Sequence, residues 1–251
     1  MGTSITVRRT SLVTVRNARF QQWRSLLDNR AKRQRHKEFL VHGVRPVSLA
    51  LEHAWPVTAV LHAHRTALSR WAESVVHEAV DRRGAELFAL TPELLRELGE
   101  RDDEPPELVL VAAMPPDDPT RLEPRIRDQE RTGRAPLVVV FDRPASPGNL
   151  GTLVRSADAF GASGVLVTGH AADPYDPKAV RATTGSLFAL PVVRLGAPRD
   201  AASWAHTHGL AIVGTDEHGT VDIADYDLTG PSMVVIGNET RGMSRAWREL
   251  C

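Results

Sequence analysis

The chain has 251 residues, of which 42% are hydrophobic and 25% are charged. These values are typical of a soluble globular protein with two domains or one large domain, and they exclude a disordered or collagen-like chain. No run approaches the roughly 18 uncharged apolar residues of a membrane-spanning helix, so we expect no membrane association. The single cysteine, Cys251, excludes an intrachain disulfide, which fits the cytoplasm, where we expect the protein.

Charge is distributed unevenly along the chain. The net charge is zero, but the first 46 residues hold 11 Lys and Arg against 2 Asp and Glu. This asymmetry favours a basic arm that contacts a polyanion such as a nucleic acid, and a solvated tail is the alternative. The basic side chains are densest over residues 30–37. They are Arg30, Lys32, Arg33, Arg35 and Lys37.

The first half of the chain predicts a basic leader followed by a small α/β domain. Residues 1–16 are polar and basic without a clear period, which is typical of a flexible leader. Residues 17–114 alternate between helical and strand-like patterns, as expected for an α/β layer. We expect strands at 39–43, 57–62 and 108–113, and helices that begin at Asn17, cover 44–53 and 69–83, and begin again at Thr91-Pro92.

The second half predicts an α/β domain with a parallel sheet. Residues 115–136 hold five prolines and many charges, so we expect a linker. From residue 137 onward, apolar runs rich in β-branched residues alternate with helical segments. We expect strands at 137–141, 164–169, 191–195, 210–215 and 232–236, and helices at 149–160, 178–188 and 201–208. Ligands bind such sheets at the carboxyl ends of the strands.

The loop after the first of these strands is a candidate site. Asn149 can cap the helix that follows, and Arg155 comes six residues later among positions that look buried. Arg155 is polar in an apolar setting, which suggests a functional role. The alternative is an arginine at the edge of the core, paired with Asp158 or Asp142.

A second candidate loop follows the last strand. Gly237-Asn238 is a tight-turn pair, and Glu239 places a carboxylate at the ligand edge of the sheet, where a solvated loop acid is the alternative. Thr215 ends a neighbouring strand. The histidine pairs at 62 and 64 and at 206 and 208 lack a third ligand, so we expect no metal site.

These two loops carry a family resemblance. Asn149-Leu150-Gly151 with Arg155-Ser156-Ala157, followed by Gly237-Asn238-Glu239 with Gly242-Met243-Ser244, resembles the first two motifs of the SpoU/TrmH family of RNA ribose 2′-O-methyltransferases, within the SPOUT superfamily. The resemblance covers 137–251. It implies a parallel-sheet catalytic domain with a trefoil knot, S-adenosylmethionine as cofactor and a homodimer. Residues 17–114 resemble the family's RNA-binding domain, which is similar to ribosomal proteins.

The resemblance also implies roles for individual residues. Asn149, Arg155 and Glu239 are implied as catalytic residues. The implied cofactor contacts are Thr215, Ile236, Gly237 and Asn238, and the basic run 30–37 is implied to bind RNA. The resemblance implies that Arg155, aided by an RNA phosphate, activates the ribose 2′-hydroxyl. A guanidinium is not readily deprotonated, so a cation that binds a phosphate and stabilises the developing alkoxide fits better. Residues 16–23 and 169–178 are similar to actinomycete members that methylate a uridine of 23S ribosomal RNA and confer antibiotic resistance.

The family's third motif, an Ile-Pro-Met segment, does not occur before Cys251. On this resemblance we expect either a fragment of a longer chain or a natural truncation, with an incomplete knot and weak cofactor binding by residues 1–251. The alternative function is therefore an RNA-binding remnant without catalysis. A nucleotide-binding metabolic enzyme would explain the sheet but not the basic arm.

Overall fold

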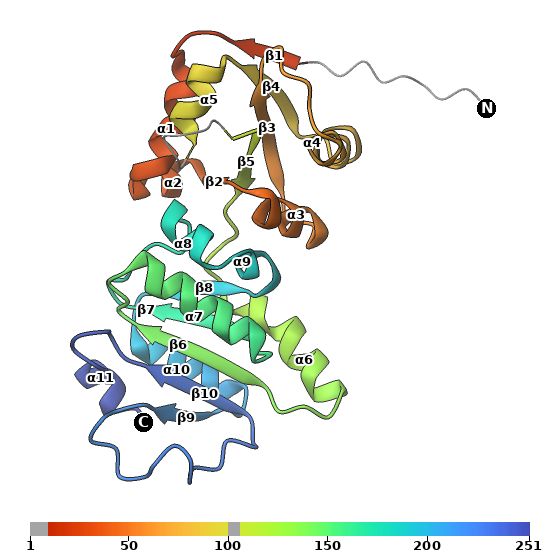
Figure 1. Ribbon diagram of the computed structural model, residues 1–251. Helices are drawn as coiled ribbons and strands as arrows, with labels where there is room; N and C mark the ends of the chain where they lie inside the picture. Colours follow the sequence, from red (N-terminus) through yellow and green to blue (C-terminus); the bar gives the residue numbers. More distant parts are fainter. Residues whose placement is uncertain (1–9, 100–105) are drawn as a thin grey trace. The chain divides into compact units, whose positions relative to one another are not determined.

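A computed structural model describes residues 10–99 and 106–251 of the chain. The chain divides into two compact units, the first made of residues 1–115 and 175–188 and the second of residues 116–174 and 189–251 (Figure 1). The leader predicted over 1–16 lies partly outside the described residues, which begin at Thr10. Within them, Thr10–Val13 form a strand, so this part of the leader prediction is wrong.

The first unit is built on a mixed five-stranded sheet with the order β1-β4-β3-β5-β2. Strands β1, β4 and β3 run parallel, whereas β5 runs antiparallel to both β3 and β2. The strands are β1 (Thr10–Val13), β2 (Glu38–Val41), β3 (Val57–Ala63), β4 (Glu86–Leu90) and β5 (Leu108–Ala113). The helices from the first part of the chain are α1 (Ala18–Asp28), α2 (Arg30–His36), α3 (Val44–Glu52), α4 (Arg70–Val76), the π-helix η1 (His77–Arg82) and α5 (Pro92–Leu98).

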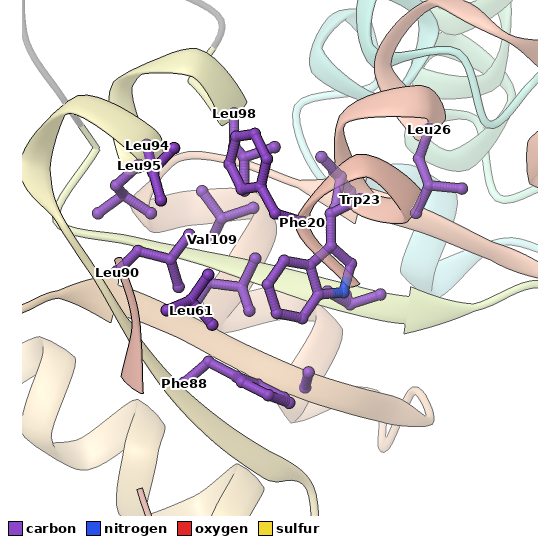
Figure 2. Packing of buried hydrophobic residues seen from close by; sticks show 14 of the residues in the cluster. Phe20, Trp23, Leu26, Leu61, Phe88, Leu90, Leu94, Leu95, Leu98 and Val109 are labelled. Atoms are coloured by element: carbon purple, nitrogen blue, oxygen red, sulfur yellow. The ribbon is translucent and has the colours of Figure 1, made fainter. Parts of the chain in front are cut away.

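Local signals in the sequence explain the ends of these helices. The Asn17 side chain accepts a hydrogen bond from the Phe20 amide at the start of α1, and Thr91 caps α5 in the same way, with proline at the first position. Helices α1 and α5 then bury their apolar residues against one face of the sheet. Figure 2 shows Phe20 and Trp23 from α1 beside Leu61 and Phe88 from the strands. This cluster is the core of the unit.

The second unit contains an all-parallel sheet with the order β8-β7-β6-β10-β9. Its strands are β6 (Leu137–Asp142), β7 (Gly164–Thr168), β8 (Val192–Leu195), β9 (Ala211–Gly214) and β10 (Ser232–Ile236). The helices are the 3-10 helix η2 (Pro119–Leu122), α6 (Glu123–Arg131), α7 (Pro147–Ala159), α10 (Pro198–Thr207) and α11 (Arg245–Arg248). Residues of η2, α6, α10 and α11 share one apolar cluster with alternate residues of β6 and β10, which places these helices on one face. The predicted parallel α/β fold is therefore confirmed, and the knot stays a prediction.

The prediction of a linker over 115–136 is wrong. Leu122 and Ile126 in this segment are 0% and 3% exposed and belong to the core cluster of the second unit. The charged residues of α6 point outward, including Arg127, which pairs with Glu123 one turn away. Charge and proline dominate the composition, but two apolar side chains at helical spacing are enough to dock a short helix.

The predicted helix over 178–188 is divided into α8 (Pro177–Ala182) and α9 (Ser186–Ala189). Thr184 and Gly185 between them have left-handed backbones, with φ of 50° and 104°. A Cβ on Gly185 would lie 2.2 Å from the Leu49 side chain, so this turn packs against α3. The segment 175–188 therefore joins the first unit, although the sequence assigned it to the methyltransferase domain over 137–251.

The strand order of the second sheet creates a topological switch point between β6 and β10. The chain proceeds from β6 through β7 to β8 in one direction and then returns to β9 and β10 on the other side of β6. The carboxyl ends of β6 and β10, which pair with Phe141 opposite Ile236, therefore flank a topological switch point. Open parallel sheets bind ligands at such points.

Candidate active site at the β6–β10 edge

Glu239 connects the loops that follow β6 and β10. One carboxylate oxygen, Oε2, accepts hydrogen bonds from the Ala145 amide at 3.1 Å and from Asn238 Nδ2 at 3.2 Å. The other, Oε1, accepts from the Ser146 amide and from Asn149 Nδ2, both at 3.2 Å. The carboxylate therefore receives four donors from two loops. It fixes the start of α7 relative to the turn after β10.

The protonation of Glu239 follows from these contacts. Partial burial alone would raise the pKa of the carboxyl, but the hydrogen bonds donated by the backbone of Ala145 and Ser146 and by Asn149 outweigh it, so the pKa lies below its ordinary value. The side chain is ionised at neutral pH. It is a poor proton acceptor there, because its donors favour the charged form.

Asn238 and Arg143 join the same two loops from the other side. The Asn238 and Gly242 backbones exchange two hydrogen bonds of 3.0 Å and close a tight turn. Asn238 Nδ2 donates to the Arg143 carbonyl at 2.7 Å, and Arg143 Nη2 donates to the Gly242 carbonyl at 3.1 Å. Arg143 has a left-handed backbone with φ of 54°, which these contacts hold in place.

A buried carboxylate, Asp142, lies beneath these loops. It is 1% exposed and accepts hydrogen bonds from Thr168 Oγ1 at 3.1 Å, Arg143 Nε at 3.1 Å and the Ser244 amide at 2.7 Å. Trp247 Nε1 donates in turn to Thr168 Oγ1 at 3.0 Å. The network was not predicted. Its only signal in the sequence is an acid at the end of a buried strand, which does not reveal the three donors that Asp142 accepts from.

Gly237 allows the turn to pack closely. A Cβ at this position would lie 2.3 Å from the Gly242 carbonyl carbon and 2.3 Å from the Met243 nitrogen. No side chain fits there without moving backbone. The glycine thus serves the contact between the two arms of its own loop.

The structure corrects the capping role of Asn149. The cap of α7 is Ser146, whose hydroxyl accepts from the Asn149 amide, while the Asn149 side chain donates to Glu239. Arg155 lies on the same helix, about 9 Å further along its axis and about 240° around it, so it faces a different direction from Asn149. Arg155 is exposed, and among the described residues no carboxylate forms an ion pair with it. The alternative pairing with Asp142 or Asp158 is therefore wrong.

The remaining predicted cofactor residues lie at the ends of β9 and β10. Ile236 ends β10 and Gly237 follows it. Thr215 follows β9, and its amide and hydroxyl both donate to the Val235 carbonyl at 3.0 Å. Thr215 lines a hollow of about 750 Å³ between β9 and the loop 216–228. Asp216 and Glu217 also line this hollow, as do the apolar residues Val213 and Val234. The Asp216 carboxylate accepts a hydrogen bond from Arg248 Nε at 3.0 Å.

The predicted RNA-binding residues lie on α2 and just after it, in the first unit. Arg30, Lys32, Arg35 and Lys37 are exposed. Arg33 is the exception, because it is 2% exposed and its guanidinium donates to the Leu26 carbonyl at 2.7 Å. Arg33 is thus part of the fold and cannot reach RNA, which corrects that prediction.

Over residues 10–99 and 106–251, no three His, Cys, Asp or Glu side chains come together in a way that could hold a metal ion. In the same ranges, no helix is both long enough and apolar enough to cross a membrane.

The chain is similar to known RNA methyltransferases over nearly its whole length. The SpoU L30e-like domain matches residues 17–110, and the SpoU rRNA Methylase family matches residues 136–251. The 23S rRNA (uridine(2479)-2′-O)-methyltransferase of Streptomyces viridochromogenes is 51% identical, over 95% of this chain and 81% of that protein.

Solved structures show the same likeness. The SpoU methyltransferase AviRb from Streptomyces viridochromogenes, in complex with the cofactor AdoMet, superposes with a TM-score of 0.85 at 51% identity and covers 94% of this chain and 86% of its own. An rRNA methyltransferase from Sinorhizobium meliloti has a TM-score of 0.81 at 26% identity, and the match covers 96% of this chain and 87% of that chain. Because both domain models match and the Streptomyces viridochromogenes enzyme is 51% identical, the chain belongs to the SpoU rRNA methylase family.

Proposed function

We propose that this protein transfers a methyl group from S-adenosylmethionine to a ribose 2′-hydroxyl of RNA, at a uridine of 23S ribosomal RNA. The relative that is 51% identical is named for that reaction. The observation that carries the proposal is the Glu239 carboxylate, which holds Asn149 and the turn of Asn238 together at the switch point of the sheet. This arrangement gives the site a fixed geometry before any ligand binds.

The residues at the ends of β9 and β10 fit the cofactor. The hollow beside Thr215 lies within the range of about 300–1,000 Å³ typical of small-molecule sites. Its apolar surface suits an adenine ring, and the Glu217 carboxylate suits ribose hydroxyls, whereas the Asp216 carboxylate already accepts hydrogen bonds from Arg248 and the His218 amide. S-adenosylmethionine supplies an activated methyl group on a sulfonium. In this proposal Thr215, Ile236, Gly237 and Asn238 hold it.

The protein's part of the reaction is positioning and charge stabilisation. Glu239 is engaged with four donors and acts as a positioning residue for Asn149 and the first turn of α7. Asn149 uses its amide nitrogen on Glu239, which leaves its carbonyl oxygen to accept a hydrogen bond from the ribose hydroxyl. Arg155 lies about 9 Å further along the helix axis than Asn149, so in this proposal its exposed guanidinium binds an RNA phosphate beside the reacting ribose. From there its charge stabilises the alkoxide as the hydroxyl proton passes to solvent water, and S-adenosylhomocysteine is the leaving product.

The RNA backbone would bind the first unit through Arg30, Lys32, Arg35 and Lys37. Each phosphate contact steepens the dependence of affinity on salt by about 0.7–0.9 in the log–log slope. A cytoplasmic location, where a ribosomal RNA substrate would be met, is part of this proposal. A homodimer, as the family resemblance implies, is also part of this proposal, and sedimentation of the purified protein tests it.

The test is tritium transfer from labelled S-adenosylmethionine to unmodified 23S rRNA. We expect transfer, with the product resistant to alkaline cleavage on the 3′ side of one uridine. Arg155→Ala should abolish transfer while cofactor affinity, measured by titration calorimetry, stays unchanged. Arg155→Lys, which keeps the charge, should retain part of the activity.

Two outcomes would contradict the proposal. Tight RNA binding without any transfer would favour the RNA-binding remnant. If Arg155→Ala lost cofactor binding to the same extent as methyl transfer, this arginine would support the fold of the pocket and would not act on the substrate.

A further inference from the structure

The turn that follows β10 has a backbone fixed by one side chain. Asn238 Oδ1 accepts hydrogen bonds from the Thr240 amide at 3.1 Å, the Thr240 hydroxyl at 3.0 Å and the Arg241 amide at 3.1 Å. The backbone bonds between Asn238 and Gly242 close the same turn. Arg241 therefore starts from a defined place. It follows Glu239 by two residues, so these two Cα atoms are at most about 7 Å apart.

The tip of this turn presents one uncompensated charge. The Glu239 carboxylate is engaged by donors of two loops, and the Thr240 hydroxyl donates to Asn238. Arg241 is exposed, and within residues 10–99 and 106–251 no group pairs with its guanidinium. The fixed backbone thus carries a cation that the fold does not use.

Two other arginines near the turn differ from Arg241 in this respect. Arg143, which donates to the turn, pairs with Asp142 at 3.1 Å. Arg248 of α11 pairs with Asp216 at 3.0 Å. Both guanidinium groups serve contacts within the protein. The charge of Arg241 is left for an anion that comes from outside, at the edge of the sheet where ligands bind.

The proposed reaction brings an anion to this edge. Glu239 accepts from Asn149 Nδ2 at 3.2 Å, so the turn of Arg241 is tied to the residue that would accept from the ribose hydroxyl. An RNA strand has a phosphate on each side of an internal ribose. A guanidinium matches phosphate geometry with two parallel donors. Arg155 lies on α7, a different element, so the two arginines suit two different phosphates.

We propose that Arg241 binds a phosphate of the RNA that flanks the target ribose, and so sets the affinity of the active site for its substrate. The inference rests on the proposed function and adds a substrate-binding residue outside the basic run 30–37. The phosphate takes no part in methyl transfer, so the contact is equally strong before and in the transition state. Arg241 therefore acts on KM for RNA, whereas Arg155 acts on kcat.

The test compares Arg241→Ala with the parent chain. Filter binding of unmodified 23S rRNA over a series of salt concentrations gives the slope of log affinity against log salt. We expect this slope to become shallower by about 0.7–0.9, since one phosphate contact is lost. Tritium transfer should show a higher KM for RNA at an unchanged kcat. Arg241→Lys, which keeps the charge, should restore the slope.

The matched control is Arg134→Ala, which removes the same charge from the same unit. Arg134 is exposed, and no described residue pairs with its side chain. It precedes β6, whose six residues separate it by about 20 Å from the edge of the sheet that carries the turn. Its slope and KM should equal those of the parent. Thermal unfolding of all variants should also match, which shows that no structure is lost.

Three outcomes would overturn the inference. A parent-like slope and KM in Arg241→Ala would remove this residue from RNA binding and leave the proposed function intact. Weaker binding of S-adenosylmethionine in calorimetry, with an unchanged slope, would assign the guanidinium to the carboxylate of the cofactor. A reduced slope that Arg241→Lys does not restore would show that the guanidinium supports the turn.

Failure of the proposed function gives a different result. Filter binding needs no methyl transfer, so the slope of Arg241→Ala can be measured in either case. A parent chain that binds RNA but transfers no methyl group would contradict the proposed function, whatever the slope of the variant.

Discussion

Replacing Glu239 by glutamine tests whether one carboxylate organises the site. Four donors converge on this side chain, from Ala145, Ser146, Asn149 and Asn238. Glutamine has nearly the same shape but a single acceptor oxygen, and its amide group would place hydrogens toward two of the donors. The substitution therefore removes about half of the acceptors and all of the charge.

The expected cost follows from these contacts. A hydrogen bond to a charged group contributes about 1.5–3 kcal/mol when it is buried. Glu239 is exposed to water, so each bond is worth about 0.5 kcal/mol here and the four together about 2 kcal/mol. Glu239→Gln loses half of these bonds and places amide hydrogens opposite two donors, so the contacts between the two loops should be weakened by about 1–2 kcal/mol.

Hydrogen exchange of the Ala145 and Ser146 amides is the direct assay. Both amides donate to the carboxylate, so a loss of about 1–2 kcal/mol should speed their exchange by about 5- to 30-fold at neutral pH. The pKa of Glu239 is lower in the folded protein than its ordinary value of 4.5. Its stabilisation is therefore complete above about pH 4.5 and is lost as the pH falls through the folded value, so the difference between variant and parent should shrink there.

Glu217→Gln is the control, because Glu217 is a loop carboxylate with 86% of its side chain exposed. It should leave both amides unaffected. Unchanged exchange in Glu239→Gln, or a difference that persists at low pH, would refute the view that the charged carboxylate holds the two loops.

Three further substitutions test other contacts by urea unfolding. Gly237→Ala should cost about 2 kcal/mol, because its Cβ would meet backbone at 2.3 Å, whereas Gly196→Ala, with open space around it, should cost far less. Asp142→Asn should destabilise the second unit by about 2–4 kcal/mol, since a buried acceptor of three hydrogen bonds loses its charge, and an effect below about 1 kcal/mol would speak against the network. Arg33→Met should cost about 3 kcal/mol while keeping side-chain length, because the guanidinium also donates to Asp176 at the start of α8, and a neutral result would mean that packing alone holds α8.

The sequence predicted most elements of the fold where the signal was local. Asn17 and Thr91 cap helices as expected, and the apolar runs of the second unit are strands in a parallel sheet. The errors arose where packing overrides composition. The segment around Ile126 is predicted as a linker because charges dominate its composition. Strand β4 (Glu86–Leu90) is missed because its run Glu-Leu-Phe-Ala-Leu contains no β-branched residue, although Gly84 precedes it.

Part of the candidate site was also predictable from local signals in the sequence. The motif residues Asn149 and Glu239 were identified from the loops that follow buried strands, and the structure brings them within hydrogen-bonding distance. The burial of Arg33 could not be read from a run of basic residues, since its partner Asp176 is more than a hundred positions away. Contacts between distant segments leave no local pattern.

The interleaving of the two units has a consequence for synthesis on the ribosome. The ribosome must add 73 residues after Pro115 to reach Phe188, and both positions belong to the first unit. At about 5–20 residues per second, that stretch takes about 4–15 s to translate. During this interval Phe39 and Trp55 lack the rings of Tyr175 and Phe188 that later pack against them. The nascent N-terminal portion therefore keeps these two aromatic side chains uncovered until β6 and β7, the first two strands of the second sheet, have been synthesised.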